Sequence, residues 1–167
     1  QIDARQAFAL EQFEKMLADY TGSKHCIVVN NGTISLTLAA MAVGIVSSDE
    51  VIVPNYTMIA TPNSLKMFGA SPVFVDVEEL TYNIDCSQIE EMITDKTVAI
   101  LAPNLMGNLC DWPKIRDIAD KHNLVVIEDS ADTLGASING KSSGFYSDMS
   151  ITSFYGSHII NCAGNGG

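Results

Sequence analysis

Positive charge is scarce in this sequence, because nine Lys and Arg residues stand against 20 Asp and Glu residues, for a formal net charge of −11. Proteins that bind nucleic acid concentrate Lys and Arg on one face to neutralise phosphates. Long apolar runs are missing too, since none approaches the roughly 20 residues that cross a bilayer as a helix. We therefore expect no nucleic-acid partner, no membrane segment and, by default, a cytoplasmic location.

Cysteine is also sparse, and no two cysteines form a C-x-x-C pair. Zinc sites and disulfide frameworks both depend on characteristic cysteine spacings, which this sequence does not show. The sequence therefore predicts no metal site, and buried free thiols are the expected state of the four side chains. These residues are Cys26, Cys86, Cys110 and Cys162.

Apolar residues, by contrast, are abundant. They make up 47% of the 167 residues, against 17% charged, as in one globular domain with a substantial core. Short β-branched runs alternate along the chain with segments of helical spacing, which predicts an α/β fold of three layers with a mostly parallel sheet buried on both faces. Strands are expected at 26–29, 51–53, 73–75, 97–102, 124–127 and 149–154, and helices at 6–20, 36–44, 57–68, 86–93 and 113–122.

The residues just after each strand deserve the closest inspection, because ligands of parallel α/β sheets bind outside the carboxyl ends of the strands. Asn31-Gly32-Thr33 follows the first expected strand and precedes a helix. Free backbone N–H groups and the positive end of the helix dipole would suit a phosphate there. A plain turn is the alternative, since this turn contains neither G-x-G-x-x-G nor G-x-x-x-x-G-K-[ST].

Two further strand ends contain groups that can do chemistry. Glu128 and Asp129 follow the run at 124–127, where burial would require at least one of them to have a cationic partner. They could cap a helix or form a surface ion pair, or one could keep a heterocyclic nitrogen protonated. His158 follows the last strand and could be a hydrogen-bonded loop residue or a general acid or base.

Taken together, ordered segments along nearly the whole chain resemble the sugar aminotransferase family named after DegT, DnrJ, EryC and StrS. This family has the fold type I architecture of pyridoxal-phosphate enzymes. The matching segments are Tyr20-Thr21-Gly22-Ser23-Lys24-His25, Asn31-Gly32-Thr33, Asp49-Glu50-Val51-Ile52-Val53-Pro54, Pro72-Val73-Phe74-Val75-Asp76, Tyr82-Asn83-Ile84-Asp85, Ile127-Glu128-Asp129 and Ser153-Phe154-Tyr155.

The resemblance implies that residues 1–167 form an incomplete pyridoxal-phosphate-binding large domain. An N-terminal helix would occupy 1–22, and the sheet and cofactor site would occupy 23–167. The C-terminal small domain of the family would be absent, so the chain would be an N-terminal fragment. Family members dimerise with active sites at the subunit interface, which implies a homodimer for the full-length protein.

Specific residues acquire expected functions from the same resemblance. The Gly32 and Thr33 amides and the Ser153 hydroxyl would bind the cofactor phosphate. Asp129 would pair with the pyridine nitrogen. Met58 falls where the family usually has an aromatic ring stacked on the cofactor, and a thioether can also pack against a ring.

His158 falls where the aminotransferases have the lysine that bonds covalently to the cofactor, and imidazole cannot form that bond. This departure, together with Asp132 among the cofactor-site residues, resembles the branch that removes the 3-hydroxyl of 4-keto-6-deoxy nucleotide sugars. We therefore expect a 3-dehydratase that uses pyridoxamine phosphate, with His158 as acid and base. The alternatives are a nucleotide-sugar aminotransferase, with glutamate as a candidate amino donor, and a non-catalytic sensor or scaffold.

Overall fold

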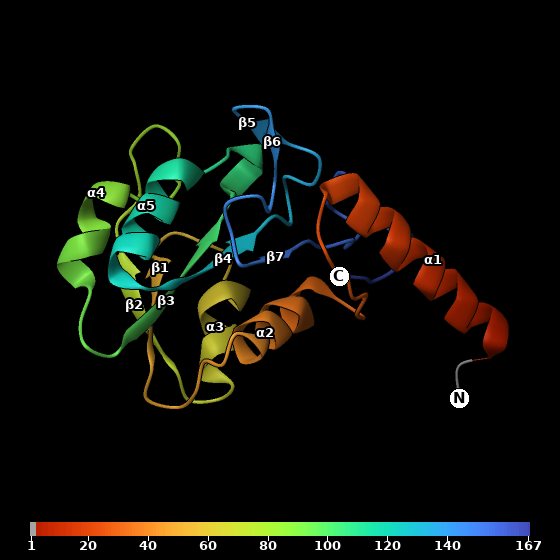
Figure 1. The fold of residues 1–167 in the computed structure, drawn as a ribbon, viewed down its shortest axis with the longest axis horizontal. Helices are drawn as coiled ribbons and strands as arrows, with labels where there is room; N and C mark the ends of the chain where they lie inside the picture. The colour runs from red at the N-terminus through yellow and green to blue at the C-terminus, as the bar shows by residue number, and fades with distance from the viewer. Residues whose placement is uncertain (1–2) are drawn as a thin grey trace.

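The computed structural model describes residues 3–167, and its centre is a parallel five-stranded sheet with helices on both faces (Figure 1). The strand order in the sheet is β2-β1-β3-β4-β7, and all four pairings are parallel. This confirms the predicted fold class. The strands of the sheet are β1 (Glu50–Pro54), β2 (Ser71–Val75), β3 (Thr97–Pro103), β4 (Val125–Asp129) and β7 (Met149–Ile151).

The remaining elements connect these strands. Among residues 3–167, no helix is long and apolar enough to cross a membrane. The helices are α1 (Ala4–Thr21), α2 (Gly32–Ala42), α3 (Ala60–Lys66), α4 (Cys86–Ile89) and α5 (Trp112–His122), with 3-10 turns η1 (Glu90–Met92) and η2 (Leu105–Gly107) and a small hairpin of β5 (Ser137–Ile138) and β6 (Lys141–Ser142).

Two hydrophobic clusters make the three layers, one on each face of the sheet. Successive side chains of a strand point to opposite faces, so Ile100 joins the cluster under α4 and α5, and Leu101 joins the cluster under α2 and α3. Both side chains are fully buried. This burial on both faces explains why the β3 sequence is continuously apolar instead of alternating with polar residues.

Helix α1 stands away from the rest of the molecule (Figure 1) and contains no buried residue. It begins with a capping box, in which the Asp3 carboxylate accepts from the Gln6 N–H and the Gln6 side chain accepts from the Asp3 N–H. It ends at Gly22, which takes the left-handed conformation expected of a helix stop. The first two residues of the predicted 1–22 segment lie outside the described residues.

The predicted strand at 26–29 does not form, and this prediction was wrong. The Val29 backbone exchanges two hydrogen bonds with Gly167 (2.8 and 3.1 Å), but the neighbouring Val28 N–H donates to the Glu14 side chain (2.8 Å). One backbone pair is too little for a ladder, because strands depend on repeated pairing along a neighbour. The helix expected over 57–68 begins only at Ala60, and the β5–β6 hairpin was not predicted.

The buried position of β3 leads to a stability prediction. Replacing Leu101 by Ala in the full-length protein should lower the free energy of unfolding by about 2 to 5 kcal/mol, because it leaves a cavity between β3 and α2/α3. Leu80→Ala is the matched control, since Leu80 is 92% exposed and its truncation should change stability by less than about 0.5 kcal/mol. Urea unfolding measures both, and equal losses would contradict this account of the core.

Candidate functional site

A cavity of about 610 Å³ opens at the carboxyl ends of the strands. Its walls come from the first turn of α2 and from the segments that follow β1, β3, β4 and β7, so residues far apart in the sequence meet there. All seven site residues predicted from the sequence line this one cavity. They are Gly32, Thr33, Met58, Asp129, Asp132, Ser153 and His158.

The first turn of α2 forms one wall of the cavity. Asn31 caps this helix by accepting the Ile34 N–H on its side chain (2.9 Å). The Gly32 and Thr33 N–H groups lie in the first turn, where no preceding helical carbonyl is available to accept them. A Cβ on Gly32 would lie 2.7 Å from Cβ of Ser153. Glycine is therefore required for the close approach between this turn and the segment after β7.

Asp129 lies at the end of β4 and is almost fully buried. Its carboxylate accepts the Ala131 N–H (3.1 Å) and a long hydrogen bond from the Thr61 hydroxyl (3.4 Å). Burial raises the pKa of Asp129 to about 6, although both of these hydrogen bonds act in the opposite direction. A protonated nitrogen in the cavity would supply the positive partner that such a carboxylate needs when ionised.

Glu128 is fully buried, but its neighbours are neutral. Its carboxylate accepts from the Ser143 hydroxyl (2.7 Å), from the Gly144 N–H (2.8 Å) and from the Asn104 side-chain amide (2.9 Å). No Lys or Arg among the described residues forms a salt bridge with Glu128 or Asp129, so no such side chain supplies the expected cationic partner. Several neutral donors can satisfy a buried carboxylate instead.

His158 and Asp132 meet across two different turns. The Nδ1 atom of His158 lies 2.8 Å from Oδ1 of Asp132, and the His158 N–H closes its own turn by donating to the Tyr155 carbonyl (3.0 Å). Met58, the residue predicted to lie against a cofactor ring, is 69% exposed at the cavity. Met58 is thus free to contact a ligand in the cavity, and its packing on a cofactor ring stays a prediction.

Asn104 lines the cavity too, and the sequence analysis missed it. Besides Glu128, its amide contacts the Thr133 hydroxyl (3.0 Å), and its carbonyl oxygen accepts from the Trp112 indole (2.9 Å) and the Cys110 N–H (3.0 Å). A signal was available, because Asn104 directly follows β3 and ligands of parallel sheets bind outside the carboxyl ends of the strands. Asn104 thus links β3, β4 and α5 beneath the cavity floor.

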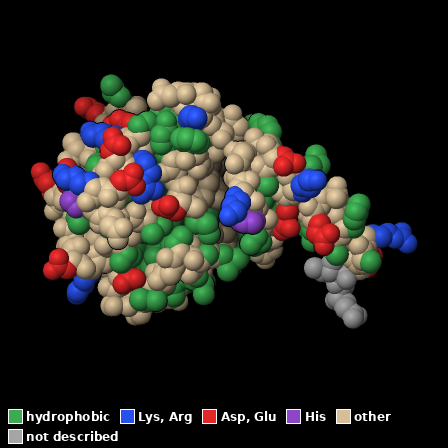
Figure 2. Space-filling model, viewed as in Figure 1, with side chains coloured by type: hydrophobic (Ala, Val, Ile, Leu, Met, Phe, Trp, Pro, Cys, Tyr) green, Lys and Arg blue, Asp and Glu red, His purple; other side chains and the backbone are tan. Residues whose placement is uncertain are grey.

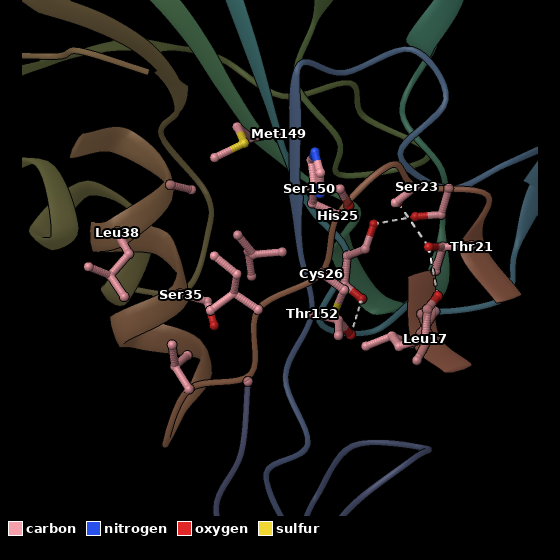
Figure 3. Close-up of a pocket in the computed structure, with 18 of the residues that line it drawn as sticks. Leu17, Thr21, Ser23, His25, Cys26, Ser35, Leu38, Met149, Ser150 and Thr152 are labelled. Carbon is pink, nitrogen blue, oxygen red and sulfur yellow. Dashed lines mark hydrogen bonds between the residues drawn. The ribbon is translucent and has the colours of Figure 1, made fainter. Parts of the chain in front are cut away.

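A second, smaller cavity of about 260 Å³ lies between the end of α1, α2 and β7. Figure 3 shows residues from these elements around it, among them Leu17, Leu38 and Met149. Its described lining contains no Asp, Glu, Lys or Arg and is mostly apolar. Its polar lining consists of hydroxyl groups and His25, and it contains no carboxylate. The larger cavity combines the α2 terminus with the Asp129 carboxylate, so it is the candidate site.

Two other candidate sites do not form. Residues 135–142 spell the phosphate-loop pattern G-x-x-x-x-G-K-S, which the sequence analysis missed. The chain folds there into the β5–β6 hairpin with Asn139 and Gly140 left-handed at its turn, and the helix that a phosphate loop requires does not follow. Among residues 3–167, no three His, Cys, Asp or Glu side chains cluster as metal ligands.

All four cysteine thiols are free, but only Cys86 and Cys110 are buried, so the expectation of buried thiols was wrong for Cys26 and Cys162.

The parallel sheet with helices on both faces, and the cavity at its strand ends, match the α/β class with the fold type I large domain of pyridoxal-phosphate enzymes. Residues 5–167 match the profile of the DegT/DnrJ/EryC1/StrS aminotransferase family, and the chain belongs to this family. It is 48% identical over 156 residues to GDP-perosamine synthase of Caulobacter vibrioides, covering 93% of this chain and 42% of that relative. The chain thus spans less than half the length of the relatives that it matches.

Solved structures show the same relationship. The aminotransferase from Psychrobacter cryohalolentis superposes with a TM-score of 0.94 at 40% identity, over 98% of this chain and 42% of that one. A GDP-4-keto-6-deoxy-D-mannose-3-dehydratase from E. coli, with bound hydrated PLP, superposes with a TM-score of 0.88 at 31% identity, over 94% of this chain and 42% of that one. A Bacillus subtilis relative contains bound cofactor PMP (TM-score 0.89, 36% identity, covering 94% and 35%). PLP and PMP are therefore cofactors of this family.

The raised pKa of Asp129 predicts how stability depends on pH in the cofactor-free protein. An unfolded carboxyl releases its proton near 3.8, whereas folded Asp129 keeps it to about pH 6. Between these values the unfolded state binds fewer protons, so the free energy of unfolding falls as pH rises, by on the order of 3 kcal/mol. Asp129→Asn should remove this fall in urea unfolding from pH 4 to 7. An unchanged slope in the variant would contradict the prediction.

Proposed function

We propose that the full-length protein is an enzyme of nucleotide-sugar metabolism that uses pyridoxal or pyridoxamine phosphate, and that amino transfer is its first candidate reaction. The observation that supports the cofactor is the cavity itself, which brings the free N–H groups at the start of α2 and the buried Asp129 carboxylate to one place. These are a donor set for a phosphate and an acceptor for a ring nitrogen.

The residues present fit such a cofactor. The Gly32 and Thr33 N–H groups and the Ser153 hydroxyl would hold its phosphate, because they converge on the same wall of the cavity. Asp129 would accept the N–H of the protonated ring, which compensates the burial of its charge. When bound, the cofactor supplies an electron sink for chemistry at the carbon attached to its amine.

The names of the relatives favour amino transfer over the dehydration that the sequence analysis placed first. Besides GDP-perosamine synthase, the chain is 42% identical to a UDP-2-acetamido-2-deoxy-3-oxo-D-glucuronate aminotransferase of Pseudomonas aeruginosa, over 93% of this chain and 44% of that one. We infer a nucleotide-linked keto sugar as substrate and glutamate as a candidate amino donor. A second subunit and a C-terminal domain would complete the site.

The second candidate is the 3-dehydration of a 4-keto-6-deoxy nucleotide sugar, which one feature of the cavity favours. No lysine among the described residues lines the cavity, whereas His158 lines it and contacts Asp132. An imidazole cannot bond covalently to the cofactor, but it can take up a proton and return it to a departing hydroxyl near neutral pH. A non-catalytic family member is the third possibility.

A homodimer is also part of the proposal. Figure 2 shows hydrophobic side chains gathered on one face over the region of α2 and α3. Exposed apolar residues of this region include Leu38, Met41 and Met67, each more than two fifths exposed. Contiguous exposed apolar surface is typical of protein interaction sites, so a partner of the same family architecture would bury it. The chain would contribute a large-domain portion, with its sheet and cofactor site in 23–167.

The close approach of Gly32 to Ser153 tests the phosphate site. Gly32→Ala should weaken pyridoxal phosphate binding to the full-length protein roughly 5- to 150-fold, because the new Cβ forces apart two segments that hold the phosphate, at a cost of about 1 to 3 kcal/mol. Gly156→Ala is the control, since a Cβ there meets nothing within 4 Å. Absorbance titration gives both dissociation constants, and equal affinities would remove Gly32 from the site.

A product assay with the purified full-length protein separates the candidate reactions. Amino transfer places the nitrogen of labelled glutamate in the sugar, whereas dehydration yields a sugar without its 3-hydroxyl, and mass spectrometry distinguishes the two products. If dehydration is observed, His158→Asn should slow it by about 10²- to 10⁴-fold with cofactor affinity unchanged, because a proton carrier is lost. Full turnover by the variant would exclude His158 from proton transfer. Cofactor binding with neither product would favour the non-catalytic possibility.

A further inference from the structure

Asp132 faces His158 from a different strand end. His158 belongs to the turn after β7, and Asp132 belongs to the turn after β4, yet Nδ1 and Oδ1 are 2.8 Å apart. The His158 side chain is 20% exposed and the Asp132 side chain 41% exposed, so the contact lies at the cavity wall and not on open surface. The contact therefore joins two backbone segments as well as two side chains.

The identity of the contacting nitrogen has a chemical consequence. An ionised carboxylate can only accept a hydrogen bond, so a neutral imidazole in this geometry must have its proton on Nδ1. We propose that Asp132 is a positioning residue, which holds His158 in the Nδ1–H form and leaves Nε2 as the atom that exchanges protons in the cavity. This inference rests on the proposed involvement of His158 in proton transfer.

The contacts of the two cavity aspartates support different functions for them. Asp129 is nearly buried and is held by the Thr61 hydroxyl and the Ala131 N–H. Asp132 is more exposed and has His158 as its hydrogen-bonded partner. Asp129 therefore suits a ring nitrogen of the cofactor, whereas Asp132 acts through the imidazole. The earlier expectation that Asp132 contacts the cofactor directly is a distinct prediction, and cofactor affinity separates the two.

A carboxylate at this place also stabilises the protonated imidazole. After His158 takes a proton on Nε2, the ring is a cation 2.8 Å from the Asp132 carboxylate, and the two form an ion pair. A base that is stabilised when it becomes protonated and held at a fixed orientation exchanges protons more effectively than a free loop histidine. Loss of Asp132 should therefore lower the rate of the proton-transfer step without removing His158.

A second histidine of the chain contacts a carboxylate through its other ring nitrogen. His122, at the end of α5, contacts a carboxylate through Nε2, which lies 2.7 Å from Oε1 of Glu90. The same reasoning puts the proton of neutral His122 on Nε2. The two histidines should thus show opposite tautomers in one spectrum, which makes His122 an internal standard for His158.

Nitrogen-15 NMR of the histidine-labelled full-length protein, at a pH where the rings are neutral, tests the positioning directly. His158 is assigned from the signals that disappear in His158→Gln. We expect the Nδ1–H form in the wild type, a shift toward the Nε2–H form in Asp132→Ala, and its recovery in Asp132→Glu. Asp95→Asn, a control in the exposed turn before β3, should leave the signals unchanged. An unchanged Nδ1–H signal in Asp132→Ala would overturn the inference.

Kinetics and cofactor titration complete the test. For a reaction that depends on His158, Asp132→Ala should lower kcat by about 10²- to 10⁴-fold. The KM for the sugar and the dissociation constant of pyridoxamine phosphate should change little. A large loss of cofactor affinity, with the tautomer unchanged, would make Asp132 a cofactor contact instead. If the tautomer changes but the wild-type protein shows no His158-dependent turnover, the positioning is upheld and only the proposed proton transfer by His158 fails.

Discussion

The site depends on one geometric constraint, which is that every strand of the sheet runs in the same direction. Parallel strands place all their carboxyl ends at one edge, so the segments after β1, β3, β4 and β7 meet there with the first turn of α2. Each segment contributes few polar side chains by itself. The cavity acquires its donors, its carboxylates and its imidazole only because the sheet brings these five segments together.

A buried polar network supports the floor of this cavity. Asn104 joins Glu128, Thr133 and the Trp112 indole, and Glu128 in turn accepts from the segment that contains Ser143 and Gly144. Every member is neutral except Glu128, so its charge is spread over several hydrogen bonds instead of being paired with a cation. Such a network holds the ends of β3 and β4 in register, because leaving any of its buried donors or acceptors unsatisfied is costly.

The neighbouring carboxylates Glu128 and Asp129 illustrate how the fold separates chemical functions. Adjacent strand residues point in opposite directions, so Glu128 enters the hydrogen-bonded network while Asp129 faces the cavity with few donors. Burial therefore raises the pKa of Asp129, which suits it to a cationic partner. A similar division separates Asp129 from Asp132, whose partner is His158. The reaction at this site will depend on what each of these three acids contacts.

Local pattern was enough to predict the α/β class and most elements, because periodicity and caps depend on neighbouring residues. Strand ends pointed to Gly32, Thr33, Asp129 and His158, whereas Met58, Asp132 and Ser153 were assigned only from the family resemblance; all seven of these residues line the cavity. Local pattern failed at 26–29, where a strand needs a backbone neighbour that the sequence does not specify, and it missed Asn104, whose contacts come from residues 6 to 29 positions away. Only the tertiary structure decided that Glu128 has neutral partners and that Asp132 contacts Nδ1 of His158. Hydrogen-bond partners across a sheet depend on how separate strands pack, and one-dimensional spacing does not encode that packing.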